Sequence, residues 1–469
     1  MVEINKKIRK ELFKIVGKEG FYDSIEDKIC YSYDATSNKF LPDLVLRPIN
    51  VTQVSSILKI CNLEKIPIVP RGAGSGYSGG SLPIKKGIVL DLTRMNKILD
   101  IDNQNLTVTV EPGIINAKLR KVVESQGLFY PPDPASMEFC TIGGNIAENS
   151  GGPQAFKYGV TKNYVLSLEV VLANGDILKI GAQTIKSVVG YNIKDLIIGS
   201  EGTLGVVTKA MLRLIPLPES RVTLMVSFDT VSKAAHTVSE IVSNKLIPAT
   251  IEFMDSLCIK SVEKHLNIGL PIEAAALLLI ELDGEKEEIE KELLKVKNIC
   301  EKIGVIELKT ASLSEEREKL WRARRATSSS INTLAPNKIN EDIAVPRSKI
   351  PEFMEKIKEI SNKYELLIPC FGHAGDGNIH VSIMLDKSNP NEYKRYKGAL
   401  MEIFKTTINL GGTLSGEHGI GISKSPYLKM ELSDKEIGLM KSIKKLFDPN
   451  NILNPNKIFP ESDSLKNEN

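Results

Sequence analysis

A glycine-rich stretch at residues 70–80 constrains the fold of this chain more than any other feature. It holds five glycines and directly follows an apolar run at residues 66–69, which is typical of a buried strand. Glycine adopts positive φ without steric cost and lets a ligand approach the backbone. Successive N–H groups of such a loop can converge on a phosphate. The stretch is therefore either a diphosphate-binding loop or a structural turn.

The residues after this stretch exclude two common kinds of phosphate loop. Leu82, Pro83 and Gly87 interrupt the chain before the next predicted strand at residues 88–92. No helix begins there, as the nicotinamide dinucleotide fingerprint would require. A Gly-Lys-Ser/Thr sequence is also missing, which excludes a nucleoside triphosphate loop.

A β-α-β unit is predicted to present the glycine loop to a ligand. It consists of a short strand at residues 44–48, a helix at residues 51–62 capped near Thr52, and the strand at residues 66–69. Ligands of open α/β sheets bind at the carboxyl ends of such strands. A second long, polar, glycine-rich loop is expected at residues 140–152, and a protein keeps such a segment when something fills it. Two glycine loops suit a large, flat, phosphorylated cofactor better than a small substrate.

Length and composition place the chain among ordinary globular proteins. Its 469 residues suffice for about three domains. Hydrophobic residues make up 42% and charged residues 25%, and the net charge is +3 with acids and bases interspersed, which does not indicate a nucleic-acid surface. No apolar run approaches the roughly 20 residues that span a bilayer.

Neither the N-terminus nor the cysteines indicate export. Ile4, Ile8, Leu12 and Ile15 form one apolar stripe among lysines, which favours a surface helix over membrane contact and does not resemble a secretory signal. The six cysteines are far apart, with no C-x-x-C pair. This spacing predicts reduced thiols in a cytoplasm and argues against an iron–sulfur cluster held by this chain.

From about residue 219 the pattern of the sequence changes. Strands at residues 222–228 and 275–282 alternate with charged amphipathic helices at residues 232–244 and 286–303. This alternation predicts a separate α+β layer.

Two of the five histidines flank a predicted hairpin turn. Residues 366–371 form the predicted first strand, and Asp376-Gly377 is a strong two-residue turn. Counting outward from that turn places His373 directly opposite His380, with Cβ atoms about 5 Å apart on one face. Two imidazoles so placed can bind one cation, and a polar surface pair is the alternative.

A turn at residues 412–419 offers a third ligand. Glu417 and His418 lie there between glycines, where the backbone can approach a ligand. Two histidines and a carboxylate leave coordination positions open for a substrate, as in catalytic metal sites. Imidazole and carboxylate suit zinc, manganese or iron. The remaining histidines, His236 and His265, lie in amphipathic helical contexts and are predicted to be exposed.

Three arginines follow the only tryptophan, Trp321. An arginine fork can bind a carboxylate bidentately. The alternative is a solvated basic helix face, which fits Arg322 and Arg325.

With these motifs in this order, residues 40–458 resemble the flavin-linked D-2-hydroxyacid dehydrogenases. This family includes D-lactate dehydrogenases, D-2-hydroxyglutarate dehydrogenases and the flavin subunit of glycolate oxidase. The resemblance implies an α+β protein: a two-part FAD-binding domain of the vanillyl-alcohol-oxidase type plus an α+β substrate (cap) domain. The expected segments are an N-terminal helical segment (1–37), the FAD-binding domain (38–218), the cap domain with a metal-binding hairpin (219–410), a C-terminal segment returning to the flavin (411–460) and a disordered tail (461–469).

The resemblance also implies the roles of individual residues. The FAD diphosphate would be held by Arg71, Gly72, Ala73, Gly74, Ser75, Gly76, Ser78 and Gly79; the flavin would be lined by Pro132, Ser136, Thr141, Gly143, Gly144, Asn145 and Gly151; Glu201, Gly205 and Val206 would reach the adenosine half, and Asn454 the isoalloxazine ring. His373, His380 and Glu417 match the divalent-metal ligands. His418 matches the catalytic base, and Arg324 matches the arginine that binds the substrate carboxylate.

Two departures from the family pattern concern the cofactor and the substrate. Some relatives bind FAD covalently to a histidine where this chain has Ser75, so we expect dissociable FAD. D-2-hydroxyglutarate enzymes carry a lysine for the distal carboxylate where this chain has Asn340, and Lys338 is out of register. This favours a small monocarboxylate, D-lactate or glycolate.

The implied activity is FAD-dependent oxidation of a D-2-hydroxy acid to the 2-oxo acid. The hydride would pass to flavin N5, the proton to His418, and a divalent metal would polarise the hydroxyl. The electrons would pass to an electron-transfer flavoprotein or an iron–sulfur subunit, and any peripheral membrane association would be through that partner. The alternatives are a flavin-dependent transferase of the alkylglycerone-phosphate synthase type, and a flavin-storing or scaffold protein, which would leave the histidines, Glu417 and Arg324 unexplained.

Overall fold

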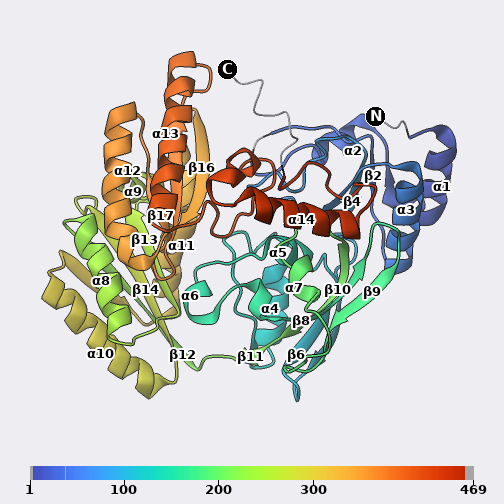
Figure 1. Cartoon of the computed structure of the whole chain (residues 1–469). Helices are drawn as coiled ribbons and strands as arrows, with labels where there is room; N and C mark the ends of the chain where they lie inside the picture. Colours follow the sequence, from blue (N-terminus) through green and yellow to red (C-terminus); the bar gives the residue numbers. More distant parts are fainter. Residues whose placement is uncertain (1–3, 37, 460–469) are drawn as a thin grey trace. The chain divides into compact units, whose positions relative to one another are not determined.

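A computed structural model describes residues 4–36 and 38–459, and the chain forms two compact units (Figure 1). Unit 1 is built from three segments: residues up to 151, residues 160–217 and residues from 417 onward. Unit 2 is built from residues 152–159 and 218–416. Both units contain helices and sheets, which confirms the α+β class. The tail expected at residues 461–469 lies outside the described residues.

The first sheet of unit 1 carries the glycine loop. Its strands are, in spatial order, β1 (Phe21–Tyr22), β2 (Leu44–Leu46), β4 (Ile88–Asp91) and β3 (Ile68–Arg71). Helix α3 (Val51–Glu64) connects β2 to β3, so the predicted β-α-β unit is present. Strand β4 lies between β2 and β3 and runs parallel to both. Because β3 ends at Arg71, the glycine loop begins at the carboxyl end of a parallel strand.

A second sheet of unit 1 is antiparallel. Its strands are, in spatial order, β5 (Ile98–Asp102), β6 (Thr107–Val110), β10 (Val206–Arg213), β8 (Val165–Val171) and β9 (Ile177–Gly181). A two-stranded ribbon joins β7 (Leu128–Phe129) to β11 (Ile215–Pro216). Strand β9 is therefore an edge strand, whose outer side has no neighbour among the described strands.

Besides α3, unit 1 has two longer helices near its ends, α1 (Lys6–Val16) and α14 (Asp434–Phe447). Its other α-helices are shorter: α2 (Ile25–Cys30), α4 (Asn116–Glu124), α5 (Ile142–Glu148) and α7 (Lys194–Ile197). Helix α1 buries Ile8, Leu12 and Val16 in the same apolar core as α3. The predicted stripe thus faces the core, with Val16 in the place expected for Ile15, which is only partly buried.

Unit 2 is organised around one antiparallel sheet of seven strands. In spatial order they are β15 (Glu307–Ala311), β12 (Ser220–Phe228), β14 (Ala276–Gly284), β13 (Thr250–Asp255), β17 (Cys370–His373), β18 (Asn378–Leu385) and β16 (Asn337–Ala344). Its helices are α6 (Ala155–Tyr158), α8 (Val231–Ser243), α9 (Ser256–Leu266), α10 (Lys286–Ile303), α11 (Ser314–Ser330), α12 (Ile350–Tyr364) and α13 (Pro390–Asn409). The central strand β14 is buried along almost its whole length, because helices α8, α9 and α10 pack against it.

Helices α9 and α11 matter most for function, because they pack on the face of the sheet that carries the histidines. Their buried side chains Ile259 and Ala323 lie in one apolar cluster with Met254 of β13 and Phe371 of β17. Helices α8 and α10 contact β12 and β14, and α13 contacts β18. The alternation predicted from residue 219 onward is therefore present.

Two local expectations were wrong. The second glycine-rich segment is not entirely a loop: residues 142–148 form α5, because Thr141 caps it by accepting a hydrogen bond from Gly144 N. Ile142 and Ile146, one turn apart, give this helix a buried side. Helix α3 is capped by Asn50 rather than near Thr52, since the Asn50 side chain accepts from Gln53 N.

Candidate functional site

The β17–β18 hairpin carries the two predicted histidine ligands in unit 2. His380 pairs with Phe371, and His373 pairs with Asn378, so the predicted direct pairing of the two histidines was wrong by two positions. The turn contains four residues rather than two, because Asp376 N and Gly377 N both donate to His373 O. A shift of two residues keeps every side chain on its face of the sheet. The two imidazoles are diagonal neighbours, with ring centroids 5.4 Å apart and an interplanar angle of 82°.

Glu252 of β13 connects the histidine pair to the arginine helix. Its Oε1 lies 2.6 Å from His373 Nδ1, and its Oε2 lies 2.5 Å from Arg324 Nε. All three side chains are buried. Burial alone would raise the pKa of the Glu252 carboxyl, but Arg324 and His373 outweigh it and hold that pKa below its usual range. The Arg324 guanidinium also lies over the ring of Phe371, 4.9 Å from its centroid. Glu252 is therefore an ionised carboxylate that fixes two predicted functional residues at once.

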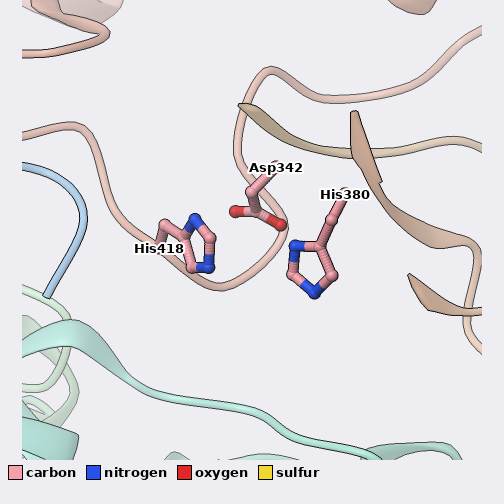
Figure 2. A group of neighbouring side chains, drawn as sticks. All are labelled: Asp342, His380 and His418. Carbon is pink, nitrogen blue, oxygen red and sulfur yellow. The ribbon is translucent and has the colours of Figure 1, made fainter. Parts of the chain in front are cut away.

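Asp342 of β16 lies directly opposite His380 in the sheet. Figure 2 shows its carboxylate directed toward the His380 imidazole. The same carboxylate accepts hydrogen bonds from Ser415 Oγ (3.1 Å) and Gly416 N (3.0 Å). Asp342 thus fixes the chain immediately before Glu417. His418, also drawn in Figure 2, follows two residues after Gly416 along the chain.

The face of β16 that carries Asp342 also carries Asn340 and Lys338, since side chains alternate along a strand. Ser382 Oγ donates to Asn340 Oδ1 over 2.9 Å. Lys338 Nζ donates to the Ser328 carbonyl oxygen over 2.6 Å, and burial lowers the pKa of Lys338 to about 8. Lys338 therefore shares a face with the predicted site, but its amino group is bound to α11.

In unit 1 the glycine loop has the backbone that a phosphate cradle needs. Gly74 and Gly79 have φ of 68° and 79°, which side-chain-bearing residues rarely adopt. A Cβ at Gly72 would collide with the hydroxyl of Thr141, so the loop and the start of α5 approach each other closely. Arg71 closes the base of the loop by donating to Tyr33 O over 2.9 Å.

The other predicted flavin-lining residues surround α5. Asn116 Nδ2 donates both to Pro132 O (3.2 Å) and to Asn145 Oδ1 (3.0 Å), which ties the Pro132 segment to the helix. Gly143 lies in α5 against Pro112, where no side chain fits. Two more of the predicted flavin-lining residues make local hydrogen bonds. The carbonyl oxygen of Ser136 accepts from Cys140 N, and Gly144 N donates to the Thr141 hydroxyl that caps α5. Unit 1 thus gathers these residues beside the glycine loop.

The C-terminal segment closes the cradle. Leu453 forms a parallel bridge with Ile68 of β3. The next residue, Asn454, donates from Nδ2 to Gly80 O (3.0 Å) and to Glu201 O (2.6 Å). Asn454 and Glu201 both have φ in the left-handed region, at 44° and 50°. Asn454 therefore holds the glycine loop and the predicted adenosine-side segment together, and Gly205 and Val206 follow in that segment at the start of β10.

A group of buried charges lies beneath this junction. Lys457 Nζ donates to Gly80 O over 2.5 Å and to Asn454 Oδ1 over 3.0 Å, and burial lowers the pKa of Lys457 to about 7. Burial raises the pKa of the carboxyls of Glu148 and Glu201. Glu201 accepts hydrogen bonds from Ile420 N and Gly421 N, both over 2.8 Å. It therefore fixes the segment that follows His418.

Glu417, the third predicted metal ligand, and His418, the predicted base, belong to unit 1, whereas His373 and His380 belong to unit 2. The His418 ring stacks on Tyr77 of the glycine loop, with centroids 5.0 Å apart and an interplanar angle of 25°. A Cβ at Gly151 would lie 2.9 Å from Glu417 Oε2, so the predicted flavin-lining glycine leaves room for this carboxylate. Glu417 follows directly after Gly416, whose N–H donates a hydrogen bond to Asp342.

Sequence reasoning missed Glu252 as a site residue. Its only signal is an acid at an inner position of the strand Thr250–Asp255, between Ile251 and Phe253, since an unpaired charge is almost never buried. The other predictions on surface residues were confirmed: His236, His265, Arg322 and Arg325 are exposed, whereas Arg324 is buried. Within residues 4–36 and 38–459, no helix has both the length and the apolar character needed to cross a membrane.

Comparison with known proteins identifies the family of the chain. Residues 42–181 match the FAD binding domain family, and residues 217–458 match the C-terminal domain of FAD linked oxidases. The chain is 48% identical to glycolate oxidase subunit GlcD of Bacillus subtilis, over 97% of both chains. It is 35% identical to a D-lactate dehydrogenase of Anaerostipes hadrus, over 93% of both. The solved structure of p-cresol methylhydroxylase with substrate bound has the same fold, with a TM-score of 0.81 at 19% identity over 97% of this chain and 96% of that one.

Proposed function

The chain belongs to the FAD-linked D-2-hydroxyacid dehydrogenase family, and from that premise we propose that it oxidises D-lactate or glycolate to the corresponding 2-oxo acid. It is an FAD-dependent oxidoreductase acting on CH–OH groups. The observation that carries the proposal is the Glu252 clamp, which holds Arg324 and His373 on one buried face of unit 2. A carboxylate anchor and a metal-ligating imidazole held side by side are what a 2-hydroxy acid requires.

We assign the substrate carboxylate to Arg324. Glu252 engages this guanidinium through Nε, and the edge formed by the two Nη nitrogens can bind a carboxylate bidentately. The ring of Phe371 supports the plane of the guanidinium. Arg322 and Arg325 are exposed, and the carboxylate that pairs with Arg325, Glu318, is exposed too, which favours the buried Arg324 as the anchor.

We assign a divalent metal, zinc, manganese or iron, to His373, His380 and Glu417. The donor set fits, because Glu252 fixes His373 Nδ1 and so orients the Nε2 nitrogen as a ligand, as second-shell carboxylates do in metal sites. Gly416 N is 3.0 Å from Asp342, and Glu417 is the next residue, so chain connectivity supports its inclusion. When bound, such a metal would lower the pKa of the substrate hydroxyl.

His418 would take the hydroxyl proton. Its ring is held by stacking on Tyr77, and the segments on either side of it are fixed by Asp342 and Glu201. FAD would supply the hydride acceptor at N5. Ser75 in the glycine loop cannot form a histidyl bond, so we propose dissociable FAD. The electrons would pass to a protein partner, either an electron-transfer flavoprotein or an iron–sulfur subunit. We also propose that the protein acts in the cytoplasm and does not bind nucleic acid.

The preference for a monocarboxylate is supported by Asn340 and Lys338. Asn340 accepts a hydrogen bond from Ser382, and the Lys338 amino group is bound to the Ser328 carbonyl. Asn340 is uncharged, and Lys338 could offer its amino group to a second substrate carboxylate only by breaking its contact with α11. Dicarboxylates such as D-2-hydroxyglutarate are therefore expected to be poor substrates.

Anaerobic mixing tests the proposal. D-lactate or glycolate should bleach the visible flavin band of the FAD-loaded protein, whereas L-lactate and D-2-hydroxyglutarate should do so far more slowly. Treatment with a chelator should abolish bleaching, and a divalent metal should restore it. If no 2-hydroxy acid reduces FAD that remains bound, the proposed oxidation is wrong and transferase chemistry becomes the better explanation.

A further inference from the structure

An exposed apolar loop in unit 1 plays no part in the chemistry proposed above. Residues 183–192 connect edge strand β9 to helix α7, and all ten are exposed. Ile185 is 75% exposed, Val188 97%, Val189 92% and Tyr191 97%. A Cβ at Gly190 would meet no atom within 4 Å, so the tip of the loop has open space around it. Four large apolar side chains in one short loop therefore project into solvent.

The only charged residue of loop 183–192 is Lys186. Lys179 and Lys194 are the nearest charged residues along the chain on either side, and Asp176 and Asp195 lie beyond them. Lys194 donates to Val165 O over 2.7 Å and forms an ion pair with Asp195, so it serves the fold. Lys186 lies on the loop itself, and Lys179 is exposed on β9. The loop thus combines protruding apolar side chains with free positive charge.

The size and shape of the loop decide between a protein and a lipid surface. A stable protein interface uses about 800 Å² and roughly 20–30 residues from each partner. Ten protruding residues fall well short of that. A second copy would also bring the lysines of two equivalent loops together, because a two-fold contact places each patch against itself. A bilayer surface, in contrast, accepts an isolated apolar loop, and anionic headgroups attract the adjacent lysines.

We propose that loop 183–192 docks the protein on an anionic membrane surface, with Val188, Val189 and Tyr191 entering the headgroup region. Tyrosine suits that depth because its ring is apolar and its hydroxyl stays hydrated. The protein would be peripheral, held by one loop and screened by salt. Docking is a property of this loop and not of the oxidation chemistry, so either can fail without the other.

Co-sedimentation of the full-length FAD-loaded protein with vesicles tests the proposal. Vesicles of phosphatidylcholine with phosphatidylglycerol should bind the protein at low salt, and phosphatidylcholine alone should bind it weakly. The variant Val188→Ser/Val189→Ser/Tyr191→Ser should lose about tenfold or more in partitioning, since binding scales with buried apolar area. Lys186→Ala should lose about fivefold at low salt.

A matched control separates the loop from general surface hydrophobicity. Leu63 and Leu446 are 79% and 78% exposed and lie on α3 and α14, outside the loop, so Leu63→Ser/Leu446→Ser should partition like the wild type. Turnover with an artificial dye should be unchanged in all variants. The proposal is overturned if wild-type protein ignores anionic vesicles or if the triple serine variant binds them equally well. A dimer that this variant dissociates would also overturn it, in favour of a protein contact.

Discussion

The Nδ1 atom of His373 lies 2.6 Å from Oε1 of Glu252, although the two residues are 121 positions apart in the chain. The pairing of β13 with β17 creates this contact, and it commits His373 to one ring orientation. Because the other oxygen of the same carboxylate engages Arg324, the position of the predicted metal ligand is coupled to the position of the predicted substrate anchor.

Glu252→Gln should therefore damage two functions together. The amide has only one acceptor oxygen, so one side of the clamp would face an N–H donor instead. We expect metal affinity and kcat/KM each to fall by about 10- to 100-fold, as for other second-shell carboxylates. Metal content after dialysis and steady-state turnover measure the two effects. Glu169→Gln, at a buried strand position of unit 1, is the matched control. Normal metal affinity in Glu252→Gln would show that the clamp does not orient a ligand.

His373→Ala and His380→Ala should each abolish turnover and leave the flavin spectrum intact. The reason is that both histidines lie in unit 2, whereas the glycine loop and its closing residues lie in unit 1. Absorbance of the purified variants checks FAD occupancy, and dye reduction checks activity. Near-normal turnover of either variant without added metal would refute the ligand assignment.

Arg324→Lys should lower kcat/KM for D-lactate strongly, and Arg322→Lys and Arg325→Lys only weakly. A charged hydrogen bond to a carboxylate contributes roughly 10- to 150-fold in transition-state stabilisation, and lysine keeps the charge but not the planar fork. Steady-state kinetics on the three matched variants decide the matter. If Arg325→Lys is the damaging change, the carboxylate anchor is one residue further along α11.

FAD should leave the protein intact on acid or denaturant treatment, because Ser75 cannot form a histidyl bond. Precipitation followed by absorbance of the supernatant measures the released flavin. Yellow colour that stays with the pellet would mean that another residue makes a covalent bond.

The buried carboxyl of Asp255 should make the unfolding free energy of unit 2 depend on pH. Burial raises the pKa of Asp255 to about 6, although its carboxylate accepts from Cys258 N and Cys370 N. A carboxyl whose folded pKa is raised contributes stability below its unfolded pKa and loses it as the pH rises through the folded value. This contribution should fall by about 3 kcal/mol between about pH 4 and pH 6.

Urea unfolding of wild type and Asp255→Asn across this pH interval measures that contribution. As the pH rises from about 4 to about 6, the unfolding free energy of the wild type should fall relative to that of Asp255→Asn. Asp100→Asn, at an exposed position, is the control and should show the same pH dependence as the wild type. A difference that does not vary with pH would show that Asp255 titrates normally.

Local signals in the sequence predicted the parts of the fold that local interactions determine. Helix α10 has the predicted limits because its apolar stripe and the glycine after Ile303 are both local. The glycine loop was placed correctly because an apolar strand ends where the glycines begin. The histidine register was wrong because the Asp376-Gly377 signal specifies a turn but not the number of residues that the turn contains.

Contacts between distant strands could not be predicted in the same way. Glu252 meets His373 only because β13 lies beside β17, and strand order is not encoded in either segment alone. The same holds for Asp342, which is close to Gly416 because β16 lies at the edge of the sheet beside β18. Residue type identified the histidines as candidates, the family resemblance singled out Arg324, and only the sheet showed what orients them.

The closing bridge between Leu453 and Ile68 also sets the order of events during synthesis. Asn454 reaches Gly80 across 374 positions, and both segments of unit 2 are translated in between. The ribosome therefore completes unit 2 before Asn454 can join the glycine loop to the Glu201 segment. Any chain that stops before Ile452 lacks both the bridge to Ile68 and the Asn454 contacts with Gly80 and Glu201.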